Sequence, residues 1–177
     1  AELSCFELPT GQKTFNLYFS IKKNKKAAEY LAGKGIPRSR LLLKGYGSSF
    51  PLVAKPVSNN ISPLYQKLNQ RLEIALHDYE SEPVIIDIEG IKVPENLQDP
   101  KGVKFSTLSN QLFYSVQIAS ISQILQNQAI ESVEELFIEV ENSSGNYLYM
   151  AGMIPTFKEA EKLMSSLIDL GFPDARI

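Results

Sequence analysis

Few side chains in this sequence could carry out covalent or metal chemistry. It contains one histidine, His77, and one cysteine, Cys5, so a Ser-His-Asp triad or a Cys-His pair would need His77. His77 shares a strand face with Glu73 and Arg71, which is typical of an exposed histidine, and Cys5 is expected to be a small buried apolar residue. No glycine-rich phosphate loop or dinucleotide fingerprint is present. We therefore predict a protein that is not an enzyme and that binds no cofactor and no metal.

The distribution of charge divides the chain into two halves. Residues 1–80 contain 12 Lys and Arg and 6 Asp and Glu, whereas residues 81–177 contain 6 Lys and Arg and 14 Asp and Glu. The halves therefore carry net charges of +6 and −8, which together give the net charge of −2 of the whole chain. Such a split favours two modules with different surfaces. The lysines at 22, 23, 25 and 26 have no aromatic residues between them, so we expect a solvated helix face and no nucleic-acid partner.

Hydropathy gives no sign of a membrane anchor. No window approaches the roughly 20 apolar residues that cross a bilayer, and the first residues do not read as a signal peptide. The sequence begins without Met and closes at Ile177 in what reads as a strand. We therefore expect a processed piece or a fragment, from which a targeting segment could have been lost.

The elements of the first half are predicted from periodicity and from residues that stop helices. Residues Glu2–Leu8 read as a strand. A helix is expected to begin at the N-cap Ser20 and to end at Gly33 and Gly35, because Pro37 prevents its continuation. The remaining elements are a strand over Arg40–Lys44, a short helix over 63–68 and a half-buried strand over Arg71–His77 with Leu72, Ile74 and Leu76 on one face.

The stretch from Asn16 to Ile74 resembles the OmpA C-terminal-like domain. An N-x-x-[LF]-S-x-x-[RK] motif, a later Y-L-x-x-x-G-I-P, then G-Y-G-x-x-x-P and N-x-R-[LV]-E-I occur in this order. The resemblance implies a small α/β module that binds peptidoglycan in Gram-negative bacteria. It also implies a strand and a helix upstream of Glu2–Leu8, so we expect either a lost N-terminal part or a partner that completes the sheet. The matching residues are Asn16, Ser20, Tyr30, Leu31, Gly35, Ile36, Pro37, Gly45, Tyr46, Gly47, Pro51, Asn69, Arg71, Glu73 and Ile74.

The resemblance also implies a ligand site, from which this sequence departs. In the family, an aspartate and an arginine clasp the two charged ends of the diaminopimelate of the peptide stem. Lys23 stands at the arginine position and lacks the bidentate fork, and Leu8 stands at the aspartate position and cannot pair with an ammonium. Glu7 could replace the aspartate if the strand register slips, but such a slip would turn it to the other face. The site residues expected for this half are Asn16, Ser20, Lys23 and Arg71.

The second half is predicted to follow a linker over residues 80–110, which contains Pro83, Pro94 and Pro100. Its expected order is βαββαβ. A capping box, Thr156 to Glu159, is expected to open its last helix. The elements are a strand over Phe113–Ala119, a helix over Ile121–Leu136, strands over Phe137–Glu141 and Tyr147–Gly152 joined by a hairpin turn, a helix that buries Ala160, Leu163, Met164, Leu167 and Leu170, and a last strand over Ala175–Ile177.

This half resembles the SPOR domain. The strand V-Q-I-A-S over residues 116–120, the aromatic strand that ends at Gly152, and the final Gly171 and Ala175 carry the resemblance. It implies binding of glycan strands stripped of their stem peptides. If Val116 and Ile118 face the helices, their neighbours lie on the open sheet face, where a sugar could bind. The expected site residues are Ser115, Gln117, Ser120, Tyr147 and Tyr149, of which the two tyrosines could instead fill the core.

Together these patterns predict an α+β chain of two small α/β sandwich modules. The first is an incomplete OmpA-like βαβ-αβ unit over residues 1–79, and the second is a ferredoxin-like, SPOR-like unit over residues 111–177. The expected function is non-catalytic binding of peptidoglycan in the periplasm, which anchors an outer-membrane or periplasmic complex to the cell wall. The alternative is a structural subunit that docks other envelope proteins and has degenerate peptidoglycan sites.

Overall fold

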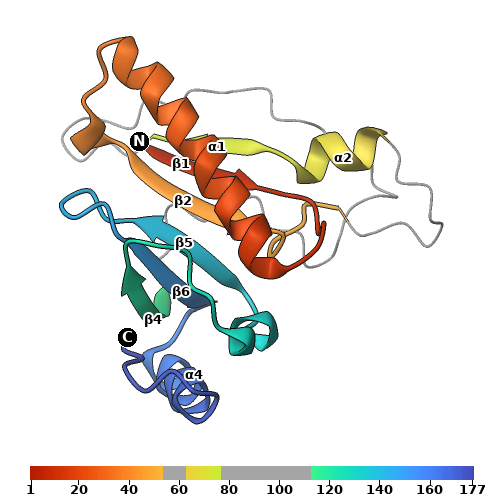
Figure 1. The fold of residues 1–177 in the computed structure, drawn as a ribbon, viewed down its shortest axis with the longest axis vertical. Coiled ribbons are helices and arrows are strands. Elements are labelled where there is room, and N and C mark those ends of the chain that lie inside the picture. Colours follow the sequence, from red (N-terminus) through yellow and green to blue (C-terminus); the bar gives the residue numbers. More distant parts are fainter. Residues whose placement is uncertain (54–62, 77–112) are drawn as a thin grey trace.

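One mixed sheet of six strands runs through the part of the chain that the computed structural model describes, residues 1–53, 63–76 and 113–177 (Figure 1). Its strand order is β3-β1-β2-β5-β6-β4. The predicted α+β class is therefore confirmed. The strands are β1 (Glu2–Phe6), β2 (Leu42–Gly47), β3 (Leu72–Ala75), β4 (Tyr114–Ile121), β5 (Leu136–Val140) and β6 (Tyr147–Ile154). The α-helices are α1 (Lys13–Gly33), α2 (Pro63–Asn69) and α4 (Phe157–Asp169), and the 3-10 helices are η1 (Arg38–Arg40) and η3 (Gln128–Ser132).

The two halves of the chain join edge to edge where β2 pairs with β5. The pairing is antiparallel and places Lys44 opposite Glu139 and Gly45 opposite Ile138. On one side of this seam, β1 is parallel to β2 and antiparallel to β3; on the other, β5, β6 and β4 are antiparallel neighbours. The expectation of two separate sheet-and-helix units is corrected here, because each half supplies three strands to one sheet. The predicted boundaries at 79 and 110 lie outside the described residues.

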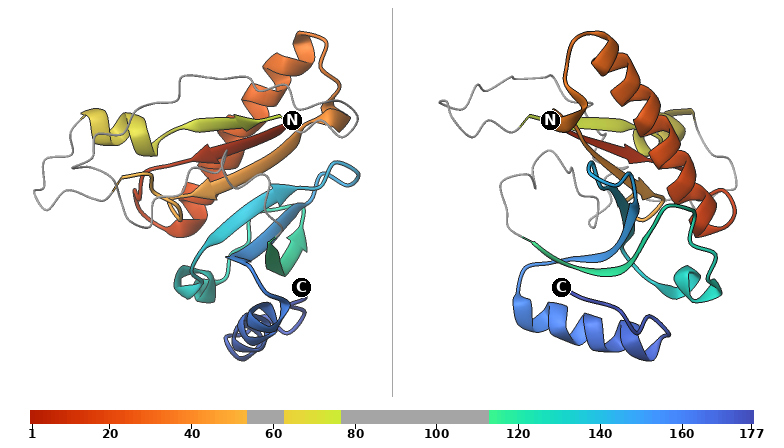
Figure 2. Two further views of the ribbon diagram at one scale, coloured as in Figure 1. Left: turned by 180° about the vertical axis from the view of Figure 1, so that it is seen from behind. Right: turned by 60° about the vertical axis from the view of Figure 1, so that its left-hand side comes forward.

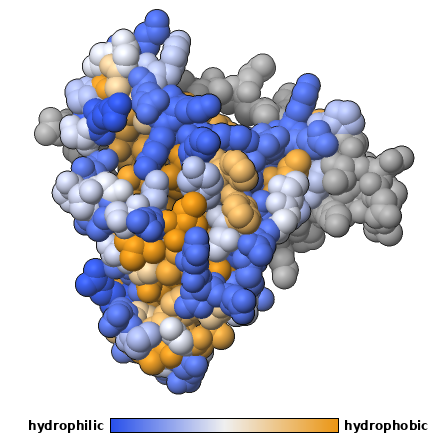
Figure 3. Space-filling view, viewed as in Figure 1, coloured by the Kyte–Doolittle hydropathy of each residue, from blue (hydrophilic) through white to orange (hydrophobic). Residues whose placement is uncertain are grey.

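A single apolar core covers one face of this sheet and is built by both halves. Alternate residues of the strands point to this face, as the period of two requires. They pack with α1, η3 and α4, which lie along the same face (Figures 1 and 2). Figure 3 shows polar side chains around the upper part of α1 and a band of apolar surface that runs from α1 toward α4. The most buried members of the core include Leu3, Leu17, Val116, Ile130, Leu136, Tyr149 and Ala151.

The opposite face of the sheet carries a smaller aromatic cluster that also crosses the seam. Phe6 and Tyr46 stack with their ring centroids 5.0 Å apart, and Phe137 of β5 lies 5.1 Å from Tyr46. The three rings come from β1, β2 and β5, and all are buried. Both faces of the sheet therefore hold the two halves together.

Polar contacts reinforce the seam at the start of α1. The Glu131 carboxylate accepts hydrogen bonds from the Lys13 backbone N–H at 3.0 and 3.1 Å, and so caps a helix whose own N-cap residue, Gln12, makes no side-chain capping bond. The Lys13 ammonium in turn donates to the backbone oxygens of Glu131 and Val133 at 2.8 and 2.6 Å. Further along α1, Lys25 donates to the Tyr147 hydroxyl at 2.7 Å.

Several predicted elements are confirmed. The strands at both ends of the first half, the short helix at Pro63, the hairpin of β5 and β6 and the capped helix α4 are all present. The Thr156 hydroxyl accepts from the Glu159 N–H, as the capping box requires. Gly35 takes a positive φ of 94° just after α1 ends.

Other predictions about the elements are wrong, and each error has a physical reason. The helix α1 begins at Lys13 rather than at Ser20, because the cap comes from Glu131 in the distant half of the chain. The helix expected over residues 121–136 is replaced by the end of β4, the short η3 and the start of β5, and apolar residues of this segment, such as Ile130 and Val133, pack into the main core without forming an α-helix. Leu170 is exposed rather than buried, and residues 175–177 contribute only an isolated bridge between Arg176 and Gln117.

The prediction that the apolar face of β3 is buried is also wrong. Leu72, Ile74 and Leu76 do share one face, but they are 43 %, 45 % and 63 % exposed. The strand lies at the outer edge of the sheet, beyond the width that α1 covers. Within the described residues, no helix is long and apolar enough to cross a bilayer.

The contact between α1 and β2 gives a direct test of this packing. A Cβ at Gly45 would lie 2.6 Å from Ile21 Cγ1 and 2.6 Å from Ser20 Oγ, so Gly45→Ala must displace these side chains or the helix that carries them. We expect the free energy of unfolding to fall by about 1–3 kcal/mol, measured by urea denaturation. Gly33→Ala is the matched control, because a Cβ there meets nothing within 4 Å. Equal stability of the two variants would contradict this packing.

Candidate functional site

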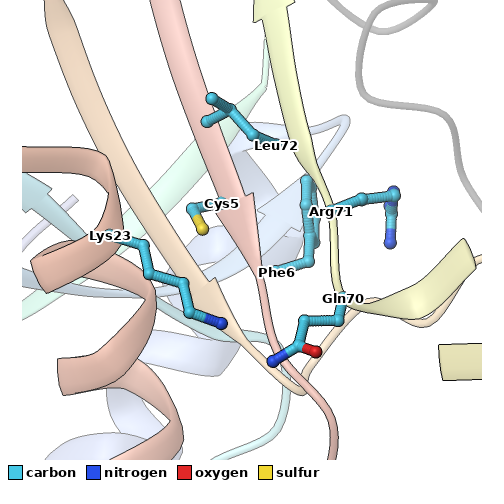
Figure 4. Close-up of a pocket in the computed structure, with 6 residues that line it drawn as sticks. All are labelled: Cys5, Phe6, Lys23, Gln70, Arg71 and Leu72. Carbon is cyan, nitrogen blue, oxygen red and sulfur yellow. The ribbon is translucent and has the colours of Figure 1, made fainter. Parts of the chain in front are cut away.

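A small pocket of about 160 Å³ opens where α1 meets β1 and the outer strand β3 (Figure 4). Its walls are mixed in character. Cys5 and Phe6 come from β1, Leu72 begins β3, and Gln70 and Arg71 lie in the turn that joins α2 to β3. The last lining residue, Lys23, reaches in from α1. The pocket is thus positioned by one helix and two strands of the rigid sheet.

Glu7, which follows β1 directly, places a carboxylate beside this pocket. It is only 8 % exposed, and its Oε1 lies 2.6 Å from the Lys23 ammonium. Its Oε2 accepts a hydrogen bond of 2.9 Å from the Gln70 amide, and its backbone N–H donates to the Gly47 carbonyl. In the described part of the chain, Oε1 accepts no hydrogen bond of good geometry, so its polar contact is the ion pair with Lys23. A buried carboxylate, a half-exposed ammonium and an amide therefore lie side by side.

Arg71 is close in sequence to this cluster, but its guanidinium lies elsewhere. The side chain is 6 % exposed, its Nε donates to Glu73 Oε1 at 2.6 Å, and its Cζ lies 3.7 Å from the centroid of the Phe6 ring. Figure 4 shows it pointing away from Lys23. Burial lowers the pKa of Arg71, and the Glu73 carboxylate opposes this effect. One of its nitrogens, Nη2, is buried without a hydrogen-bond partner.

Two of the four predicted site residues in this half have structural contacts instead. Asn16 is 2 % exposed and bonds the side chains of Thr10 and Ser48. Ser20 is fully buried, donates to the Leu17 carbonyl and accepts from the Gly47 N–H. Both join α1 to neighbouring segments. The structure therefore does not bring Asn16, Ser20, Lys23 and Arg71 together in one accessible site.

In the second half, the predicted site residues divide between the two faces of the sheet. Val116 and Ile118 are buried in the main core, so Ser115 and Gln117 lie on the opposite face, as expected. Tyr149 is in the core, where its hydroxyl accepts from the Leu125 N–H. The remaining contacts are those of Ser115 with the Gly152 carbonyl, of Ser120 with Asn146, and of Tyr147 with Lys25.

This division is a correction to the predicted second site. Tyr147 and Tyr149 point toward the helices, so they cannot stack on a sugar that contacts Gln117. The side chain of Gln117 remains partly exposed, although its backbone N–H and C=O both pair with Arg176. Within the part of the chain that the structure describes, the Gln117 side chain makes no hydrogen bond, so it is the member of this set that could contact a ligand on this face.

Sequence reasoning gave Glu7 only a conditional role, and it missed Gln70. The alternation of side chains along β1 predicts that Glu7 faces α1, because Leu3 and Cys5 point to α1 and Glu7 lies two residues further on the same face. No register slip is needed on β1. The β-bulge at this end places Phe6 opposite Gly47, with the extra residue on β2. Gln70 carried no such signal, since its contact depends on how the turn after α2 folds.

The thiol of Cys5 gives the pocket a measurable pH dependence. Burial raises the pKa of this thiol from 9.0 to about 11, and the Glu7 carboxylate adds to the effect. The unfolded chain ionises near the ordinary value, so the thiol's contribution to stability is complete below pH 9.0 and is lost as the pH rises toward about 11. We expect wild type to lose on the order of 1–2 kcal/mol more than Cys5→Ala between about pH 8 and pH 10.5, measured by urea denaturation. Parallel pH profiles would contradict this assignment.

Comparisons with known proteins do not supply an identity for this site. No protein-family model, no curated protein and no solved structure matches the chain. In the described stretches, no group of three or more His, Cys, Asp and Glu side chains could hold a metal ion, and His77 lies outside them. The OmpA-like and SPOR-like resemblances therefore stay predictions, and function must be argued from the pocket beside Glu7 and Lys23.

Proposed function

We propose that this chain binds peptidoglycan without transforming it, and that its pocket beside α1 takes the zwitterionic end of a stem peptide. In this proposal, the first half of the chain is OmpA-like and the second half is SPOR-like. The protein lies in the periplasm. The observation that carries the proposal is the Glu7 carboxylate, which lies 2.6 Å from the Lys23 ammonium beside a pocket whose walls include Phe6 and Leu72.

The chemistry of the pocket suits an amino acid with both charges exposed. The ammonium of such a ligand would pair with Glu7, and its carboxylate would pair with Lys23. Exchanging the internal ion pair for these two contacts leaves the buried Glu7 carboxylate paired, and the Lys23 ammonium can turn to the ligand because its side chain is 47 % exposed. Phe6 and Leu72 offer apolar walls to the ligand's methylene groups.

One observation favours the alternative function, a docking subunit of an envelope assembly. Glu7 already has Lys23 and Gln70 as partners, so the cluster is satisfied without a ligand. In that case, the pair serves to hold α1 against the end of β1. The two functions differ in whether purified cell wall binds to the isolated chain.

A cosedimentation assay with purified sacculi tests the proposal. We expect wild-type protein to pellet with sacculi and Glu7→Gln to bind about tenfold more weakly, because a charge-assisted hydrogen bond to the ligand is worth about 1.5–3 kcal/mol. Lys23→Met should weaken binding similarly. Lys26→Met, one turn further along α1 and exposed, is the matched control and should bind as wild type.

A second comparison separates the two halves. Titration with a muropeptide that carries diaminopimelate should respond to Glu7→Gln, whereas binding of stem-free glycan should respond to Gln117→Ala. If wild-type protein stays in the supernatant at low salt, peptidoglycan binding is ruled out and the docking function is favoured. If Gln117→Ala alone abolishes binding to sacculi, the site lies on the second half's open face.

A further inference from the structure

The segment that contains α1 and η1 is strongly basic. Residues 13–40 include eight Lys and Arg and one acidic residue, Glu29. Three of the eight cations bond to other parts of the fold, namely Lys13, Lys23 and Lys25. The other five are exposed and form no salt bridge within the described residues: Lys22, Lys26, Lys34, Arg38 and Arg40. The fold therefore leaves unpaired positive charge along α1 and at its C-terminal end.

Two of these cations belong to a row of exposed side chains on the outer side of α1, which we call the α1 stripe. Its members follow one another at the helical spacing of three or four residues: Phe15, Phe19, Lys22, Lys26 and Tyr30. The three aromatic side chains are 54 %, 47 % and 66 % exposed. The opposite side of α1 packs on the sheet, and α1 lies in front of the strands in Figure 1, so Figure 3 looks onto its outer side.

Aromatic rings and cations lie next to each other at both ends of the α1 stripe. Tyr18 lies beside Phe19, with ring centroids 5.7 Å apart, and the Lys22 ammonium is 5.8 Å from the Tyr18 ring. At the other end, the Lys34 ammonium is 5.6 Å from the Tyr30 ring. This combination is typical of surfaces at the boundary between water and lipid, where aromatic rings sit at headgroup level and lysines extend to the phosphates.

We propose that the α1 stripe, together with Lys34 and η1, binds the surface of an anionic phospholipid bilayer. The charges are complementary, because anionic lipids attract a polybasic surface and each Lys or Arg near the bilayer adds to the attraction. From Phe15 to Tyr30 the stripe is about 22 Å long at roughly 1.5 Å per residue, so its members can contact one bilayer surface together. This inference does not rest on the proposed cell-wall function.

A bilayer suits this surface better than a folded protein does. A stable protein interface needs roughly 800 Å² of matching surface on each partner, whereas the α1 stripe is a single helix ridge. The mobile headgroups of a bilayer adapt to such a ridge. The outer helix of the second half differs in charge, since α4 carries Phe157 together with two lysines and three acidic residues. An anionic bilayer would therefore favour α1 over α4.

Cosedimentation with vesicles tests the role of the charges. Wild type should pellet with vesicles of phosphatidylglycerol and phosphatidylcholine, stay in the supernatant with phosphatidylcholine alone, and lose binding as the salt concentration rises. Lys22→Gln/Lys26→Gln should weaken binding at least about tenfold. The matched control is Lys158→Gln/Lys162→Gln, an exposed pair with the same spacing on α4, which changes the net charge equally and should bind as wild type.

A fluorescent side chain tests whether the aromatic residues reach the lipid. The chain contains no tryptophan, so Phe19→Trp introduces a single indole on the α1 stripe. Addition of anionic vesicles that contain brominated phosphatidylcholine should shift its emission to the blue and quench it. Phe157→Trp is the matched control, because Phe157 is similarly exposed, at 51 %, but lies on α4. Its emission should change much less.

Three results would overturn the inference: no binding of wild type to anionic vesicles at low salt, equal binding of the α1 and α4 lysine variants, or equal quenching of the two tryptophans. Binding to single-stranded RNA or to polyglutamate without binding to vesicles would also overturn it. The basic surface would then fit a nucleic acid or an acidic protein instead.

Discussion

The antiparallel pairing of β2 with β5 is the interaction on which the rest of the structure depends. It involves only two residue pairs, Lys44 with Glu139 and Gly45 with Ile138, yet it turns two three-stranded sheets into one. The same pairing aligns the strand faces, so that one apolar core and one aromatic cluster cross the seam. Burial raises the pKa of the Glu139 carboxyl, and the Lys44 ammonium opposes that effect. The seam is thus a partly buried region, and it is closed on both faces by side chains from each half.

The parts of the fold that could be predicted from sequence depend on local interactions, whereas the contacts across this seam join residues far apart in the chain. The pattern of β1, the hairpin of β5 and β6, the capping box of α4 and the stop of α1 are set by residues within a few positions of each other, and these were predicted. The start of α1 was not, because its cap is Glu131, 118 residues from Lys13. The pairing of β2 with β5 is equally non-local, since the alternation of apolar and polar residues along a strand does not determine which strand pairs with it. The charge difference between the halves favoured two separate modules, but net charge describes surfaces and not which strands pair.

The candidate site shows the same limit. Lys23 was predicted from sequence and lies at the pocket, whereas Asn16 and Ser20 are structural and Arg71 points to Phe6 and Glu73. Motif matching selects residues that a fold needs as readily as residues that a ligand needs. Glu7 could have been chosen from alternation alone, because it continues the face of Leu3 and Cys5. The hydrogen bond from Gln70 to Glu7 could not have been predicted in this way, since residues in a turn follow no periodic pattern. The proposed binding of a zwitterion therefore depends on the contact between Glu7 and Lys23, which only the folded chain reveals.

The most direct test of the central claim, that both halves form one sheet, is a set of backbone proton NOEs across the seam. The structure predicts cross-strand NOEs that link Lys44 with Glu139 and Gly45 with Ile138, of the same kinds as those that link the paired residues of β5 and β6. The pairs within each half serve as internal controls. If the NOEs within β1–β2 and β5–β6 are present and those between β2 and β5 are absent, the halves are separate units and the account is contradicted.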